Sequence, residues 1–136
     1  MPPPEEPTPA KSLDEVAEEV GLYPREAFEF VQVGLNYTVN TLHRALEDPE
    51  ASRHVSGQQL SEGLRGYALK QWGLLARTVL RRWNIYRTDD FGRIVFALIE
   101  YGHMSKTDED SEEDFKNVFD FATAFDADYR IGMKAP

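Results

Sequence analysis

Apolar residues recur at every third or fourth position along most of this 136-residue chain, which is the spacing of one face of an α-helix. The longest such pattern covers residues 25–46 and contains two neighbouring apolar stripes. One stripe begins at Phe28 and the other at Phe30. Because a helix with two apolar stripes is buried on two sides, we predict that residues 25–46 form the central helix of the fold.

Residues that start helices divide the rest of the chain. Ser12 and Ser56 each stand three positions before a glutamate or glutamine, which is the capping-box pattern. Thr88 is the expected cap of another helix, and the acidic residues after Ser111 suit the first turn of the last one. The sequence therefore predicts short helices after each of these four residues.

Glycines shape the segment from residue 57 to residue 83. We expect Gly73 to end one helix and to separate it from a short helix over residues 74–83, which turns Leu75 to the same side as Val79 and Trp83. Gly63 and Gly66 lie inside the preceding helix, where each costs about 0.5–1 kcal/mol relative to alanine. Close approach of another backbone at both glycines is the expected compensation.

These patterns predict an all-α fold, a compact bundle of about six helices with mixed crossing angles. We expect a single domain over residues 12–128. Residues 1–11 hold five of the eight prolines and predict a disordered tail, and residues 129–136 predict a flexible C-terminal tail. A minor two-stranded β pairing of residues 84–87 with residues 128–131 is a further hypothesis.

Composition excludes several classes of protein. The chain has no cysteine, so it has no disulfide, no thiolate zinc site and no cysteine nucleophile, and this fits a reducing cytoplasm. The start of the chain does not resemble a secretory signal. No apolar run approaches the roughly 20 residues of a membrane helix. We therefore predict a cytoplasmic protein with no membrane partner.

The charge is distributed unevenly along the chain. The net charge is −9, but residues 65–93 carry seven basic residues and two acidic ones, a local charge of +5. Residues 1–64 sum to −8 and residues 94–136 to −6. The basic segment therefore meets an anionic partner or pairs internally with the acidic flanks.

The candidate binding surface lies in this basic segment. Arg77 and Arg81 are four residues apart, so they share one face of the helix over residues 74–83. The residues predicted to form the surface are Arg77, Arg81 and Arg82, with Arg87 and Trp72 at its edge.

Three interpretations of this cluster stay open. The leading alternative to a binding surface is internal salt bridging with acids such as Glu26, Glu29, Asp108 and Asp110. As a binding surface, the cluster favours a protein partner or self-association, because arginine with tryptophan is frequent at interface hot spots. A helix–turn–helix protein that binds nucleic acid is the next hypothesis, and the acidic net charge disfavours it.

No catalytic or metal site is predicted. The three histidines, His43, His54 and His103, fall in different elements, and no Gly-x-Ser-x-Gly motif is present. The acidic run over residues 108–114 lacks the glycine that a calcium loop needs at its sixth position. We therefore expect a binding or regulatory module without a cofactor, and place an enzyme with an unrecognised site third.

Several strings of residues resemble a small uncharacterised protein family described as restricted to Verrucomicrobia and Planctomycetes. The resemblance covers roughly residues 12–128. It implies a bacterial, single-domain, cytoplasmic protein and assigns no activity, cofactor or catalytic residue to any position. The strings that carry it are Tyr23-Pro24-Arg25-Glu26-Ala27-Phe28, His54-Val55-Ser56-Gly57, the run from Tyr67 to Trp83, Thr88-Asp89-Asp90-Phe91-Gly92 with Ile94-Val95-Phe96, and Lys106-Thr107 with Asp110-Ser111 and Asp114-Phe115.

Overall fold

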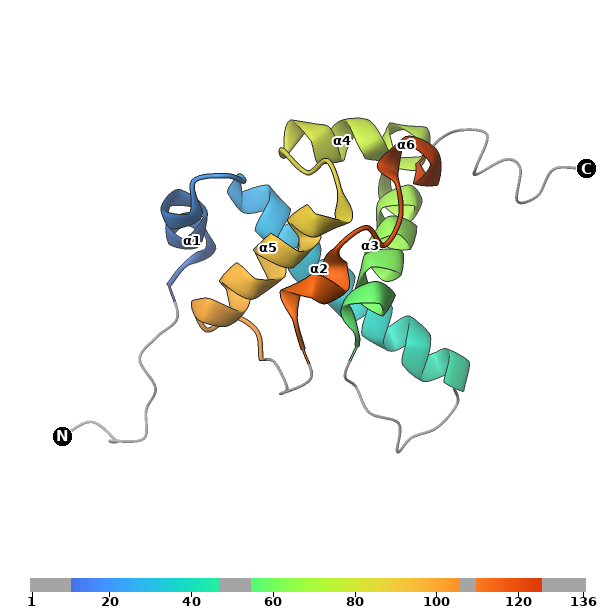
Figure 1. Cartoon of the computed structure of the whole chain (residues 1–136), viewed down its shortest axis with the longest axis horizontal. Helices are drawn as coiled ribbons and strands as arrows, with labels where there is room; N and C mark the ends of the chain where they lie inside the picture. Colours follow the sequence, from blue (N-terminus) through green and yellow to red (C-terminus); the bar gives the residue numbers. More distant parts are fainter. Residues whose placement is uncertain (1–10, 47–54, 106–109, 126–136) are drawn as a thin grey trace, which may run out of the picture.

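A computed structural model describes residues 11–46, 55–105 and 110–125 of the chain (Figure 1). Within these ranges the protein is mainly α-helical and has no β-strand. The helices run in several directions instead of lying parallel (Figure 1). In chain order, the α-helices (α) and 3-10 helices (η) are α1 Leu13–Val20, α2 Arg25–Leu46, α3 Gly57–Trp72, η1 Gly73–Leu75, α4 Ala76–Arg82, α5 Thr88–Glu100, η2 Glu112–Phe115 and α6 Phe121–Ala124.

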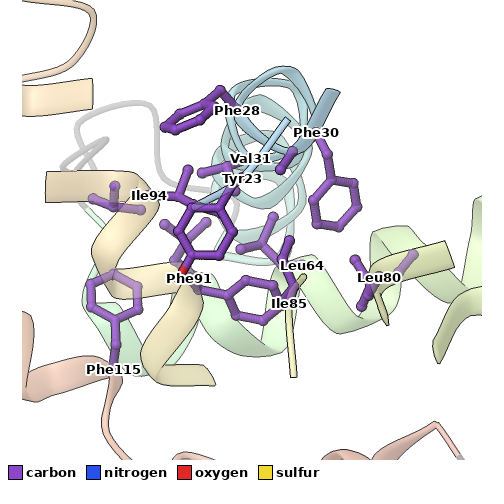
Figure 2. Packing of buried hydrophobic residues seen from close by; sticks show 14 of the residues in the cluster. Tyr23, Phe28, Phe30, Val31, Leu64, Leu80, Ile85, Phe91, Ile94 and Phe115 are labelled. Carbon is purple, nitrogen blue, oxygen red and sulfur yellow. The ribbon is translucent and has the colours of Figure 1, made fainter. Parts of the chain in front are cut away.

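The central position predicted for α2 is confirmed, because α2 contacts α1, α3 and α5. Phe28 and Val31 of its first apolar stripe are fully buried. Phe30 of the second stripe is also buried, and its ring lies on a different side of α2 from Phe28 (Figure 2). Farther along that stripe Val33 is 48% exposed, so the second stripe is covered only in part.

Both predicted capping boxes are present. At the start of α1, Ser12 Oγ accepts a hydrogen bond from the backbone N–H of Glu15 (3.1 Å), and the Glu15 side chain accepts one from the N–H of Ser12 (2.9 Å). Ser56 and Gln59 make the same reciprocal pair at the start of α3, both at 3.0 Å. Each pair satisfies backbone donors that a helix start leaves unpaired.

The predicted close approach holds at one of the two interior glycines of α3. A Cβ atom added to Gly63 would lie 1.9 Å from Thr38 Oγ1 of α2, so no larger residue fits there. The neighbour is a side chain and not the backbone that we expected. The prediction is wrong for Gly66, because a Cβ atom there would meet no atom within 4 Å.

The start of α5 differs from the prediction that Thr88 caps it. Thr88 is the first residue of the helix, and its hydroxyl donates to the backbone oxygen of Phe115 (2.6 Å) and accepts from the N–H of Val118 (3.1 Å). The cap bond is made instead by the side chain of Asp90, which accepts from the N–H of Arg87 (3.2 Å). Thr88 therefore ties the segment around η2 to α5.

Asp90 is the centre of a buried polar network that joins α5 to the start of α2. Its side chain accepts hydrogen bonds from the hydroxyl of Tyr23 (2.5 Å), the N–H of Tyr86 (2.8 Å) and the guanidinium of Arg93 (2.9 Å). Asp90 is 6% exposed and Tyr23 is 4% exposed. The carboxylate is tolerated there because several donors surround it.

The prediction of one last helix after Ser111 is wrong. Ser111 does cap a helix start, since its Oγ accepts from the N–H of Glu113 (3.1 Å), but the helix is the short 3-10 turn η2. The chain then leaves the helical conformation and forms the single turn α6. Phe121 and Phe125 are buried, and the ring centroid of Phe121 lies 5.7 Å from that of Phe91 in α5, so aromatic packing holds this segment to the core.

The predicted β pairing is not supported. Residues 84–87 form the turn between α4 and α5, where Asn84 has a positive φ of 68° and donates its side-chain N–H to the backbone oxygen of Leu22 (2.9 Å). Residues 128–131 lie outside the described part of the chain. The tails predicted over residues 1–11 and 129–136 also lie outside it, except for Lys11.

Candidate functional site

The predicted binding surface is carried by α4, which lies along the top edge of the molecule in Figure 1. As expected, α3 ends at Trp72, and Gly73 turns the chain with a positive φ of 56° that glycine adopts readily. Ala76 and Leu80 are fully buried and pack one side of α4 on the core. The opposite side of η1 and α4 is left exposed.

We call this exposed side the α4 outer face. Arg77 and Arg81 lie one turn apart on α4, and Leu74 and Leu75 end η1 directly before this helix. The face consists of Leu74, Leu75, Arg77, Thr78, Arg81 and Arg82, all exposed.

Two leucines on this face were missed by sequence reasoning. Leu74 is 55% exposed and Leu75 is 64% exposed, although Leu75 was expected to point inward with Val79. The prediction is wrong because residues 73–75 form a 3-10 turn, whose tighter winding changes the phase relative to α4. Adjacent leucines directly before an arginine-rich helix were the available signal.

In the described part of the chain, the arginines of this cluster are not paired with internal carboxylates. Within residues 11–46, 55–105 and 110–125, the guanidinium groups of Arg77, Arg81 and Arg82 make no ion pair. By contrast, Arg25 pairs with Glu29, with 2.7 Å between Nη1 and Oε2. The α4 outer face therefore presents three cations whose charge no described carboxylate neutralises.

The acids named as internal partners behave differently from one another. Glu29 is engaged by Arg25, and Glu26 is exposed without an ion pair in the described ranges. Asp110 has an interaction partner other than the arginines of α4, and Asp108 lies outside the described residues.

The structure separates Arg87 from the other arginines. Arg87 is exposed at the start of α5, where it lines a hollow with Asn117, Asp120 and Phe121 to which no residue of α4 contributes. Trp72 is half-buried at the end of α3, and Gly73 separates it from the two exposed leucines. The place of Trp72 at the edge of the α4 outer face stays a prediction, and Arg87 belongs to a neighbouring surface.

A groove of about 390 Å³ lies where α2, α3 and the end of α4 meet, and we call it the aromatic groove. Phe30 is its most buried ring, and both tryptophans of the chain line it. The ring centroids of Trp72 and Trp83 are 5.4 Å apart. Sequence reasoning missed this groove, because its rings come from three helices. Its lining residues are Glu26, Glu29, Phe30, Val33, Tyr67, Gln71, Trp72 and Trp83.

A second hollow, of about 310 Å³, is lined mostly by apolar side chains of α2, α3 and α5. The polar side chains among its lining residues are those of Ser105, Asp110, Ser111 and Asp114. No histidine or nucleophilic pair lies in it. The chain between two of its lining residues, Ser105 and Asp110, is outside the described ranges, so we assign the hollow no ligand.

The described residues contain no group of three or more histidine, aspartate or glutamate side chains that could hold a metal ion. The ring of His103 contacts the backbone oxygen of Lys11. The side chain of His43 and all of His54 lie outside the described part. In the same part, no helix combines the length and the apolar character needed to cross a bilayer.

No protein family, curated protein or solved structure matches this chain. The resemblance to the small bacterial family therefore stays a prediction. The case for a function depends on the two surfaces described above, the α4 outer face and the aromatic groove.

Proposed function

We propose that this protein is a cytoplasmic binding module that holds an acidic, apolar segment of a partner protein against the α4 outer face. One observation carries the proposal: three arginines without a described ion-pair partner and two exposed leucines share one face of η1 and α4. The combination offers both the charge and the apolar area that a specific protein contact uses.

The leucines argue for a protein partner. Burying a leucine side chain stabilises a complex by roughly 1.5–3 kcal/mol relative to leaving it in water. Leu74 and Leu75 are adjacent and both more than half exposed, so one partner segment can cover them together. Phosphate groups of a nucleic acid would gain nothing from these side chains.

The arginines define the chemistry of that segment. Arg77 and Arg81 are one helical turn apart, and carboxylates spaced three or four residues apart on a partner helix match that separation. Guanidinium groups bind carboxylates through paired hydrogen bonds. The partner segment that fits is therefore an amphipathic helix with aspartate or glutamate beside leucine-like side chains.

The test uses two fluorescent 18-residue helical peptides that share one leucine pattern, one with glutamate and the other with lysine between the leucines. We expect the wild-type protein to bind the glutamate peptide at least about tenfold more tightly than the lysine peptide by fluorescence anisotropy. Arg81→Glu and the double variant Leu74→Ser/Leu75→Ser should each weaken binding by about tenfold. Circular dichroism verifies that the variants fold.

The matched control is Lys116→Glu, which changes the net charge as Arg81→Glu does but lies beside η2. It should alter affinity by less than about twofold. Equal binding of both peptides, or equal effects of the two charge reversals, would overturn the proposal. Tight binding of a 20-base-pair DNA duplex, with a logarithmic salt slope near −0.9 per phosphate contact, would replace it with the nucleic-acid hypothesis.

A further inference from the structure

The aromatic groove is a second candidate site, independent of the proposed partner surface. The ring planes of Trp72 and Trp83 meet at 80°, so the two indoles are in a T-shaped contact at this groove. The Phe30 centroid lies 5.5 Å from that of Trp72 and 5.9 Å from that of Trp83. Tyr67 adds a fourth ring, 5.7 Å from Phe30.

The charged side chains that line this groove are all acidic. Glu26 and Glu29 lie three residues apart on α2, so both carboxylates reach the same side of that helix. No lysine or arginine lines the groove. Arg25 neutralises part of the charge of Glu29, but Glu26 is exposed and makes no ion pair in the described ranges. The groove therefore combines electron-rich ring faces with net negative charge.

We infer that the aromatic groove binds a quaternary ammonium group. Such a cation carries no N–H, so it is held by the faces of aromatic rings and by nearby negative charge, not by directional hydrogen bonds. Rings at nearly a right angle, with two carboxylates at the rim, supply both. A primary ammonium or a guanidinium would pair with the carboxylates of Glu26 and Glu29, whereas the ring faces, which need no N–H from the ligand, favour the quaternary group.

The chain contains its own reporter for this test. It has two tryptophans, and both line the groove, so intrinsic tryptophan fluorescence reports on this site. The probe is choline, compared with 3,3-dimethyl-1-butanol, which has the same shape but carbon in place of the charged nitrogen. We expect choline to change the emission saturably and to bind at least about tenfold more tightly than the neutral alcohol, at constant ionic strength.

Two variants localise the effect. Glu26→Gln removes an exposed charge at the rim and should weaken choline binding by about threefold. The matched control Glu18→Gln removes an exposed charge from α1 and should leave affinity unchanged. Trp72→Leu should abolish choline binding, and the remaining Trp83 should then show no change in emission when choline is added. Circular dichroism verifies that this variant folds.

A trimethyllysine peptide and its unmethylated form distinguish the source of the ammonium group. Tighter binding of the trimethylated peptide than of choline would place the group on a protein, and the reverse would indicate a free metabolite. Equal responses to choline and the neutral alcohol, or equal effects of Glu26→Gln and Glu18→Gln, would overturn the inference. Because these probes carry no acidic helix, failure here leaves the result for the α4 outer face unaffected.

Discussion

Individual side chains here take roles that neighbouring residues in the sequence were expected to play. Asp90 is buried and accepts hydrogen bonds from backbone N–H groups just before α5, from the side chain of Arg93 and from Tyr23, 67 positions earlier. Thr88 gives up the capping role and binds the segment beside η2. The cap residue types were recognisable, but their partners were set by distant parts of the chain.

The Tyr23–Asp90 bond predicts a dependence of stability on pH. Burial, and then the hydrogen bond to Asp90, raise the pKa of Tyr23 above its ordinary value of 10.0. Above pH 10 the unfolded chain releases this proton while the folded protein retains it, so stability falls as pH rises. Below pH 10 the contribution is fully present.

The variant Tyr23→Phe tests this assignment. At pH 7 it should lower the free energy of unfolding by about 1–2 kcal/mol, because it removes the hydroxyl that bonds Asp90. The difference from wild type should shrink as pH rises from 9 to 11, as measured by urea unfolding. Tyr86→Phe, an exposed control, should change little. A constant difference across this pH range would contradict the assignment.

Among the helices, the close contact between α2 and α3 depends on one glycine in each helix, Gly34 in α2 and Gly63 in α3. Gly63 lets α3 approach Thr38 of α2, and Gly34 of α2 makes room for Leu64 of α3. Gly66 is one turn from Gly63 in sequence and faces open space. The sequence pattern cannot tell these glycines apart, because which side of α3 meets α2 is set by the packing of both helices.

Two alanine substitutions should therefore act in opposite directions. Gly63→Ala forces its methyl group into Thr38 and should destabilise the fold by about 1–3 kcal/mol. Gly66→Ala meets no atom and should stabilise it by about 0.5–1 kcal/mol, since alanine loses less backbone entropy in a helix. Thermal and urea unfolding measure both. The same sign for both variants would show that α2 and α3 do not pack as described.

For the molecule as a whole, charge has opposite effects on the stability of the fold and on partner binding. The net charge of −9 is self-repelling in the compact state, and the described ion pairs other than that of Asp90 join exposed or partly exposed groups, which contribute little to stability. The cations of the α4 outer face make no ion pair with the acids of the described ranges. Salt should therefore affect stability and binding in opposite ways.

Raising NaCl from 10 mM to 500 mM should increase the free energy of unfolding in urea by on the order of 1 kcal/mol, because screening relieves the repulsion. The same change should weaken binding of the glutamate peptide to the α4 outer face several-fold. Arg81→Glu should reduce the salt dependence of that binding. A fall in stability with added salt would show that ion pairs outweigh repulsion.

The positions of α1 to α5, the central place of α2 and the two capping boxes could be predicted from the sequence, because they depend on local spacing and on hydrogen bonds within one turn. The exposure of Leu75, the partners of Asp90 and the meeting of four aromatic rings in one groove could not. These features depend on how helices far apart in the chain pack together, and periodicity carries no information about that. Only the tertiary structure shows that the arginines of α4 make no ion pair with the described carboxylates.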